Sequence, residues 1–118
     1  MEEMSEALSD EKHEPEKRQA DIFLAARNND LQELKLALEQ GQRLDIIIPE
    51  NGHTPLHTAA LWGHNDFIIA ALSHPTANPW ARSRRGLLPY AIAADRRDTH
   101  IMKLFFDAMY PEGRFPLP

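Results

Sequence analysis

The stretch that decides the fold is Asn51-Gly52-His53-Thr54-Pro55-Leu56-His57-Thr58-Ala59-Ala60-Leu61-Trp62-Gly63-His64. It predicts a short helix, because Thr54 is a good N-cap and Pro55 fits the first helical position, where its missing N–H costs nothing. Apolar residues then recur at i, i+3 and i+4, as one face of a helix requires, at Leu56, Ala59 and Ala60. Gly63 fits the position just beyond the helix end, which favours glycine.

A second helix is expected from about Asn65 to Leu72, directly after this stretch. Its apolar positions are Phe67, Ile68, Ala71 and Leu72. The segment 74–79 then breaks the helix, because it contains the two prolines Pro75 and Pro79. The middle of the chain therefore predicts a helix-turn-helix unit followed by a loop.

The same unit occurs three times with a period of 34 residues. The alanine pair recurs as Ala25-Ala26, Ala59-Ala60 and Ala93-Ala94, and Gly52 and Pro55 recur as Gly86 and Pro89. A unit of this size cannot cover its own apolar face, so the units must stack. The sequence thus predicts an all-α solenoid of three stacked helix-turn-helix repeats with short hairpin loops, over residues 16–49, 50–83 and 84–110.

The quoted stretch resembles the ankyrin repeat signature Gly-x-Thr-Pro-Leu-His-x-Ala-Ala-x-x-Gly-His. The first and third copies depart from it, with Ala20-Asp21-Ile22-Phe23 and Leu88-Pro89-Tyr90-Ala91 in the corresponding places. Terminal repeats are expected to be atypical, because they cap the stack. The resemblance implies that six residues form a structural motif, namely Thr54, Pro55, Leu56, His57, Gly63 and His64. It also implies that His57 joins the Thr54 hydroxyl to neighbouring backbone by hydrogen bonds.

Length and composition suit one small domain, with 118 residues of which 42% are hydrophobic and 26% charged. The absence of cysteine excludes disulfides, Cys-ligated zinc and a thiol nucleophile. No apolar run approaches the ~20 residues of a membrane span, and the acidic start lacks the apolar core of a secretory signal. These features predict a cytoplasmic protein without membrane contact, with a secreted effector as the alternative.

The charge is unevenly distributed. Residues 1–18 hold seven acids and three bases, and we expect residues 1–15 to form a mobile acidic arm. A short acidic docking segment is the alternative for this part. Residues 79–103 instead hold six bases and two acids. The net charge of −5 argues weakly against bulk electrostatic binding to nucleic acid or anionic membranes.

The patterns that carry catalysis are missing from the sequence. It has no glycine-rich phosphate loop, no Gly-x-Ser-x-Gly and no arrangement of nucleophile, base and stabiliser. His53 and His57 are four residues apart, a spacing that could hold a metal on a helix, but His53 precedes the helix. We therefore expect no enzyme activity, no metal, no cofactor and no small-molecule substrate.

The resemblance implies a protein-binding module that uses its concave face and hairpin tips, as an adaptor or an inhibitor. The expected partner-binding residues are Glu50, Asn51, His53, Leu61, Trp62, Arg82, Arg84, Arg85 and Arg96. Trp62 is either an interface hot spot or part of the scaffold. Arginine suits carboxylates, which favours an acidic protein partner. Alternatively, the arginines are only solvated or contact the arm 1–16. The alternative functions are nucleic-acid contact and a role as a regulatory subunit.

The last helix is expected from Thr99 to Tyr110 and carries two adjacent apolar faces. The tail 111–118 could fold back as a lid, with Phe115 and Leu117 covering the apolar surface that the stack leaves uncovered. Otherwise this face is a dimer or partner surface. The protein is therefore expected to be a monomer or a weak homodimer. Ile46 and Trp80 occupy equivalent positions before their hairpins, which favours a scaffold role for both.

Overall fold

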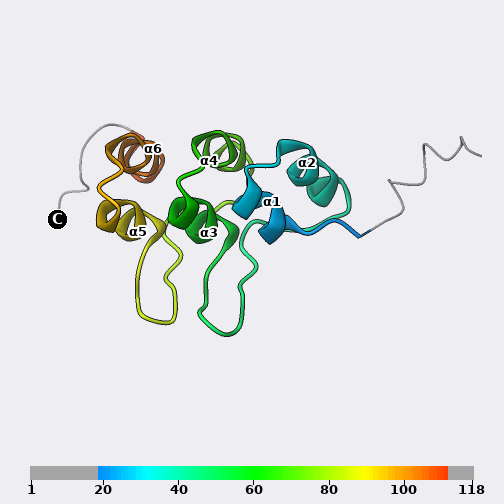
Figure 1. The fold of residues 1–118 in the computed structure, drawn as a ribbon, viewed down its shortest axis with the longest axis horizontal. Coiled ribbons are helices and arrows are strands. Elements are labelled where there is room, and N and C mark those ends of the chain that lie inside the picture. Colours follow the sequence, from blue (N-terminus) through cyan, green and yellow to red (C-terminus); the bar gives the residue numbers. More distant parts are fainter. Residues whose placement is uncertain (1–18, 112–118) are drawn as a thin grey trace, which may run out of the picture.

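Six helices form two parallel rows in a computed structural model that describes residues 19–111 (Figure 1). The helices are α1 (Ile22–Asn28), α2 (Leu31–Glu39), α3 (Pro55–Trp62), α4 (Asn65–Leu72), α5 (Pro89–Asp95) and α6 (Thr99–Met109). We call the row α1, α3 and α5 the inner helices, and the row α2, α4 and α6 the outer helices. No strand occurs within residues 19–111. The all-α fold predicted from the sequence is therefore confirmed.

The helices stack as three consecutive pairs. Each inner helix packs on the outer helix of its own pair, and α1 contacts α3 as α3 contacts α5. In the outer row, α2 contacts α4 and α4 contacts α6. This is the arrangement expected when no pair can cover its own apolar face.

The first helix of the middle pair, α3, is capped at both ends by the residues that the sequence predicted. Thr54 is the N-cap of α3 and Pro55 is its first residue. Gly63 ends α3 in the left-handed conformation, with φ of 75°, and α4 begins two residues later at Asn65. A left-handed residue at this place favours glycine because it has no Cβ.

The first and third pairs use other residues for the same tasks. The carboxylate of Asp21 accepts the N–H groups of Phe23 and Leu24 at 3.0 and 3.2 Å at the start of α1. In the third pair Leu88 stands at the N-cap of α5 and provides no side-chain cap. Asn29 and Arg97, with φ of 55° and 59°, make the left-handed turns that Gly63 makes in the middle pair.

Two long hairpin loops precede α3 and α5 and project from the same edge of the inner row (Figure 1). The Ile48 N–H donates to the His53 carbonyl at 2.9 Å, and in the next hairpin the Ser83 N–H donates to the Leu87 carbonyl at 2.9 Å. We number the hairpins by the helix pair they precede, so the hairpin before α3 is the second and the hairpin before α5 is the third. Gly52 turns the second hairpin with φ of 73°. The Arg84 N–H donates to the Asn51 carbonyl at 2.9 Å, so the two hairpins are bonded to each other.

The core lies between the two rows. Alanines 25, 26, 59, 60 and 93 are buried, which lets neighbouring inner helices approach closely. The largest fully buried side chains of the core are Phe67, Phe105, Ile22, Leu44, Leu56, Ile68 and Ile101. Met102, which is equivalent to Ile68, is only partly buried.

The last helix ends in an aromatic cluster. The ring of Tyr110, just after α6, lies 5.1 Å from Phe106 and 5.4 Å edge-on from Trp80. Trp80 is nevertheless 45% exposed and Ile46 is 38% exposed, so the scaffold role expected for this pair of positions is only partial. The expected acidic arm 1–15 and the lid formed by Phe115 and Leu117 lie outside the described residues.

Candidate functional site

His57 links the middle pair of helices to the third hairpin. Its Nδ1 accepts the Thr54 N–H at 3.1 Å and lies 3.0 Å from the Thr54 hydroxyl, while its Nε2 lies 2.8 Å from the Leu87 carbonyl oxygen. A carbonyl oxygen only accepts, so Nε2 carries the hydrogen and Nδ1 is the acceptor. The imidazole is thus held neutral, with both nitrogens used by the backbone of two successive repeats.

His64 makes the corresponding link in the other direction. Its Nε2 lies 2.8 Å from the carbonyl oxygen of Arg27, at the end of α1. Nearby, the Asn29 side-chain oxygen accepts the Phe67 N–H at 3.0 Å. Side chains at the helix ends therefore fix the first and second helix pairs relative to each other.

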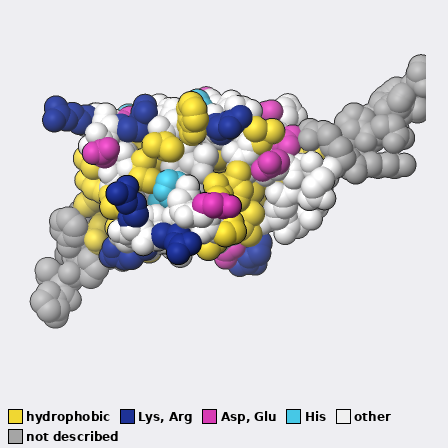
Figure 2. Space-filling view, turned by 60° about the horizontal axis from the view of Figure 1, so that its bottom comes forward, with side chains coloured by type: hydrophobic (Ala, Val, Ile, Leu, Met, Phe, Trp, Pro, Cys, Tyr) yellow, Lys and Arg dark blue, Asp and Glu magenta, His cyan; other side chains and the backbone are white. Residues whose placement is uncertain are grey.

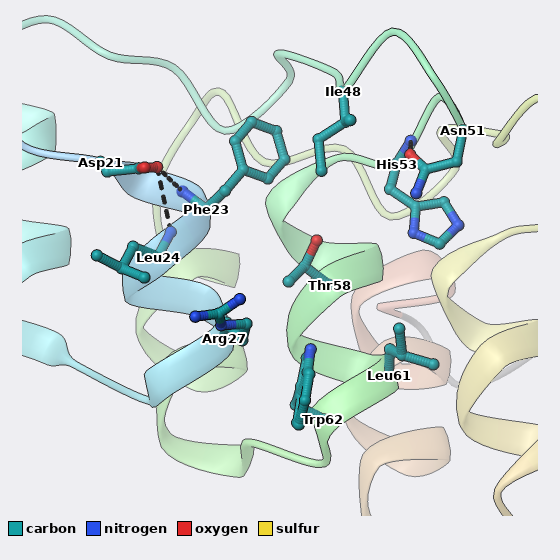
Figure 3. A pocket seen from close by; sticks show the side chains of 10 residues that line it. All are labelled: Asp21, Phe23, Leu24, Arg27, Ile48, Asn51, His53, Thr58, Leu61 and Trp62. Atoms are coloured by element: carbon teal, nitrogen blue, oxygen red, sulfur yellow. Dashed lines mark hydrogen bonds between the residues drawn. The ribbon is translucent and has the colours of Figure 1, made fainter.

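A hollow of about 350 Å³ opens between α1 and α3 on the side of the inner helices that faces the hairpins (Figure 3). Phe23 and Ile48 point toward each other at its upper end, and Trp62 lies at its lower end. Arg27 lies on the α1 side. We call this the first hollow.

A second hollow of about 460 Å³ lies between α3 and α5. His53 and Leu61 line both hollows and form the wall between them. The other residues of the second hollow are Arg85, Leu87, Ala91, Ile92, Asp95 and Arg96. The two hollows together make a groove across all three inner helices, which we call the inner groove.

Leu61 and Trp62 stand in the middle of the inner groove with 47% and 52% of their surfaces exposed. Figure 2, which brings the hairpin side forward, shows hydrophobic side chains on both sides of a central histidine, with basic and acidic side chains around them. The stack itself does not bury these apolar groups. A surface of this kind typically marks a site of interaction.

The family model for ankyrin repeats, described as three copies, matches residues 3–83 and 22–115. The chain belongs to the ankyrin repeat family. A search of curated proteins finds no significant match. Ankyrin repeats generally act as protein–protein interaction modules and are typically non-catalytic, so the inner groove of this ankyrin stack is the natural candidate for a protein-binding surface.

Three of the four arginines expected to bind a partner donate hydrogen bonds to backbone within the ankyrin stack. Arg84 Nη1 donates to the Pro49 carbonyl at 3.0 Å, and Arg96 Nη1 donates to the Leu61 carbonyl at 2.9 Å. The first bond joins the two neighbouring hairpins, and the second joins α5 to α3. Arg82 Nη1 donates to the Gly86 carbonyl at 2.9 Å within the third hairpin. The Arg85 side chain instead lines the second hollow.

The remaining expected partner-binding residues lie near the second hairpin. Glu50 and Asn51 are exposed, and the Asn51 side-chain oxygen accepts the His53 N–H at 2.9 Å. His53 is half-buried, and its ring is stacked on that of His57 at 5.1 Å. The structure therefore brings Asn51, His53, Leu61 and Trp62 to the first hollow, whereas Arg82 and Arg84 belong to the hairpins.

The first ankyrin repeat contributes more residues to the groove than the sequence indicated. Phe23, Leu24 and Ile48 line the first hollow and were not among the expected partner-binding residues. Arg27, which is equivalent to Leu61 in the 34-residue period, lines the same hollow. A comparison of positions 34 residues apart could have indicated more of these groove residues. Leu24 and Thr58, for example, are equivalent positions, and both line the first hollow.

No group of three or more metal-binding side chains occurs between residues 19 and 111. The same part of the chain contains no helix that is long and apolar enough to cross a membrane.

Burial lowers the pKa of His57, and the neighbouring His53 lowers it further, while the hydrogen bond to the Leu87 carbonyl opposes the change. Burial also lowers the pKa of His53. A group whose pKa is lower in the folded state contributes stability above its unfolded pKa of about 6.5 that is lost as pH falls through the folded pKa. Here the neutral imidazoles are the forms that the fold favours.

We therefore expect the melting temperature to fall as the pH is lowered from about 7.5 to 5.5, because folding disfavours protonation of both histidines. Circular dichroism at 222 nm measures it. The His57→Gln variant should be less stable at the upper pH and should show a smaller decrease. His100→Gln is the matched control, since His100 is exposed on α6, and it should retain the full decrease. An equal decrease in all three proteins would contradict this assignment.

Proposed function

We propose that this ankyrin repeat protein is a non-catalytic adaptor or inhibitor that binds a protein partner in its inner groove. The observation that carries the proposal is the exposure of Leu61, which lines both hollows, and of Trp62, which lines the first. Tryptophan is enriched among residues that dominate binding energies, especially near the centre of an interface. An adaptor and an inhibitor would use the same groove and differ only in what the partner does.

Fewer arginines are available to bind an acidic partner than the sequence suggests. Arg82, Arg84 and Arg96 each donate to a backbone carbonyl, so part of their hydrogen-bonding capacity serves the scaffold. Within residues 19–111 the side chains of Arg27 and Arg85 make no hydrogen bond or ion pair, and both line the groove. We expect an acidic side chain of the partner to meet one of these two arginines.

The test is a paired affinity capture from a lysate of the cells that express the protein. The double variant Leu61→Ser with Trp62→Ala should lose a protein that wild type captures, because truncating a buried hot spot costs about 2 kcal/mol or more, at least a thirtyfold loss of affinity. Circular dichroism confirms that the variant folds.

Ile69→Ser is the matched control for this experiment. Ile69 is 51% exposed on the outer helix α4, so the variant removes a similar apolar group from the opposite side of the stack. It should capture the same partner as wild type. A captured set that is identical for all three baits would contradict binding in the inner groove.

A further inference from the structure

Three equivalent residues follow one another along the inner groove. Arg27, Leu61 and Asp95 are separated by 34 residues each and occupy the same place on α1, α3 and α5. Across the groove, a partner therefore meets a cation, then an apolar side chain, then an anion. The order of charged and apolar side chains in this row gives the groove a direction along the axis of the stack.

The two charged residues of this row are available to a partner. The Arg27 and Asp95 side chains are exposed and make no hydrogen bond or ion pair with any residue from 19 to 111. Two other arginines lie near Asp95, but they differ in position: Arg85 comes from the hairpin, and Arg96 is turned toward the Leu61 carbonyl. Asp95 is thus the anion at the far end of the row.

The hollows alternate with these residues. The first hollow lies between Arg27 and Leu61, and the second lies between Leu61 and Asp95. Packed helices lie about 8–10 Å apart, so the hollow centres are separated by roughly one such step. A partner that fills both hollows must present two side chains on one face at this spacing.

An α-helix comes nearer to this spacing than an extended strand does. Residues seven apart on a helix lie on the same face and are separated by about 10.5 Å. On a strand, same-face residues are separated by about 6.8 Å for two residues or 13.6 Å for four. The geometry of the groove therefore favours a helix laid across α1, α3 and α5.

We propose that the inner groove receives an amphipathic helix of a partner protein. The helix places two large apolar side chains, seven residues apart, into the two hollows. One turn beyond one of them an acidic residue meets Arg27, and one turn beyond the other a basic residue meets Asp95. This inference rests on the proposed function, because it specifies the partner of the same groove.

All four positions of this motif lie on one stripe of the helix. Numbered from the first apolar residue, they are −4, 0, +7 and +11, which are spaced by four or seven residues and therefore share a face. The motif can lie across the groove in either direction, as long as its acidic end reaches α1. Opposite charges are thus required at the two ends, whichever end comes first in the sequence.

The probe is a phage-displayed library of 20-residue peptides on an alanine- and glutamine-rich helical background. Positions −4 and +11 vary among Glu, Lys and Gln, and positions 0 and +7 vary among Leu, Phe, Trp and Ala. Wild type should enrich large apolar residues at both inner positions, together with one Glu and one Lys at the ends. We expect the enrichment of these peptides to exceed that of the Glu/Glu and Lys/Lys peptides by about tenfold, because like charges repel across an interface.

Single charge reversals make the test specific. Asp95→Arg should shift the selection to Glu at both ends, and Arg27→Glu should shift it to Lys at both ends. Both residues are exposed, and the hydrogen bond from His64 uses only the Arg27 backbone, so both variants should fold. Lys35→Glu, an exposed residue of the outer helix α2, is the control and should leave the selection unchanged.

The outcomes separate this inference from the proposed function. One outcome is that the selected peptides keep their apolar anchors but have the same end charges with wild type and with both charge-reversal variants. This outcome would overturn the charge assignment and leave groove binding intact. Enrichment that is equal for wild type and the Leu61→Ser with Trp62→Ala variant would overturn the use of the groove itself. A selection without any enriched peptide would overturn the helix proposal, while the affinity capture decides the proposed function independently.

Discussion

Replacing Phe67 with alanine is expected to lower the free energy of unfolding by about 3–5 kcal/mol, the range measured for phenylalanine in well-packed cores. Phe67 is fully buried on α4, and this helix contacts α2, α3 and α6. The cavity would therefore open in the middle of the stack, between the first and third repeats, where neither end can relax into it. A loss of this size is a large fraction of the stability of a small domain.

Urea denaturation followed by circular dichroism measures this loss. Ile69→Ala is the matched control on the same helix, because Ile69 is 51% exposed and should change the stability by no more than about 0.5 kcal/mol. Both substitutions remove apolar carbon from α4, so the difference between them reports burial. Similar losses in the two variants would show that Phe67 is not in a closely packed core.

The second large effect is expected for Gly52→Ala, by about 2–5 kcal/mol of unfolding free energy. Gly52 has φ of 73°, which an L-residue adopts only with strain. A Cβ at this place would also lie 2.7 Å from the backbone nitrogen of Arg84 in the next hairpin. Because that nitrogen donates to the Asn51 carbonyl, the two hairpins could separate only by breaking this hydrogen bond.

Gly86→Ala separates the two causes, since Gly86 is the equivalent residue of the third hairpin. Its φ is 83°, but a Cβ there would have no atom within 4 Å. The control should therefore lose only the strain of about 1–2 kcal/mol. Equal denaturation midpoints for the two variants would contradict the close approach of the hairpins at Gly52.

Much of the fold could be predicted from the sequence because local chemistry decides it. Thr54, Pro55 and Gly63 set the bounds of α3 through capping and backbone conformation, which depend on a few adjacent residues. The 34-residue period then places the other two pairs, although Leu88 and Arg97 perform the tasks of Thr54 and Gly63 less completely. The stacking follows from apolar faces that no single pair can cover.

The candidate site was harder to predict because it depends on contacts between repeats. The sequence shows that Arg84 and Arg96 are charged, but only the hairpin and helix positions show that they donate to the Pro49 and Leu61 carbonyls. Likewise, Ile48 lies between the first two repeats in the sequence, and only the stack brings it opposite Phe23. The sequence shows which residues of the groove are apolar, but their grouping into two hollows could not be predicted from it.

The side-chain links between successive repeats also bear on how the chain is made. His57 to Leu87 and Phe67 to Asn29 join residues 30 and 38 apart, and the strongest helix contacts lie within one repeat or between neighbours. Because these contacts join neighbouring repeats, folding can begin in one repeat and propagate to the next. A ribosome adds a repeat in a few seconds at about 5–20 residues per second, which is slow compared with helix formation. Each repeat can therefore dock on the one before it as it emerges from the exit tunnel, and assembly proceeds from the N-terminal end during translation.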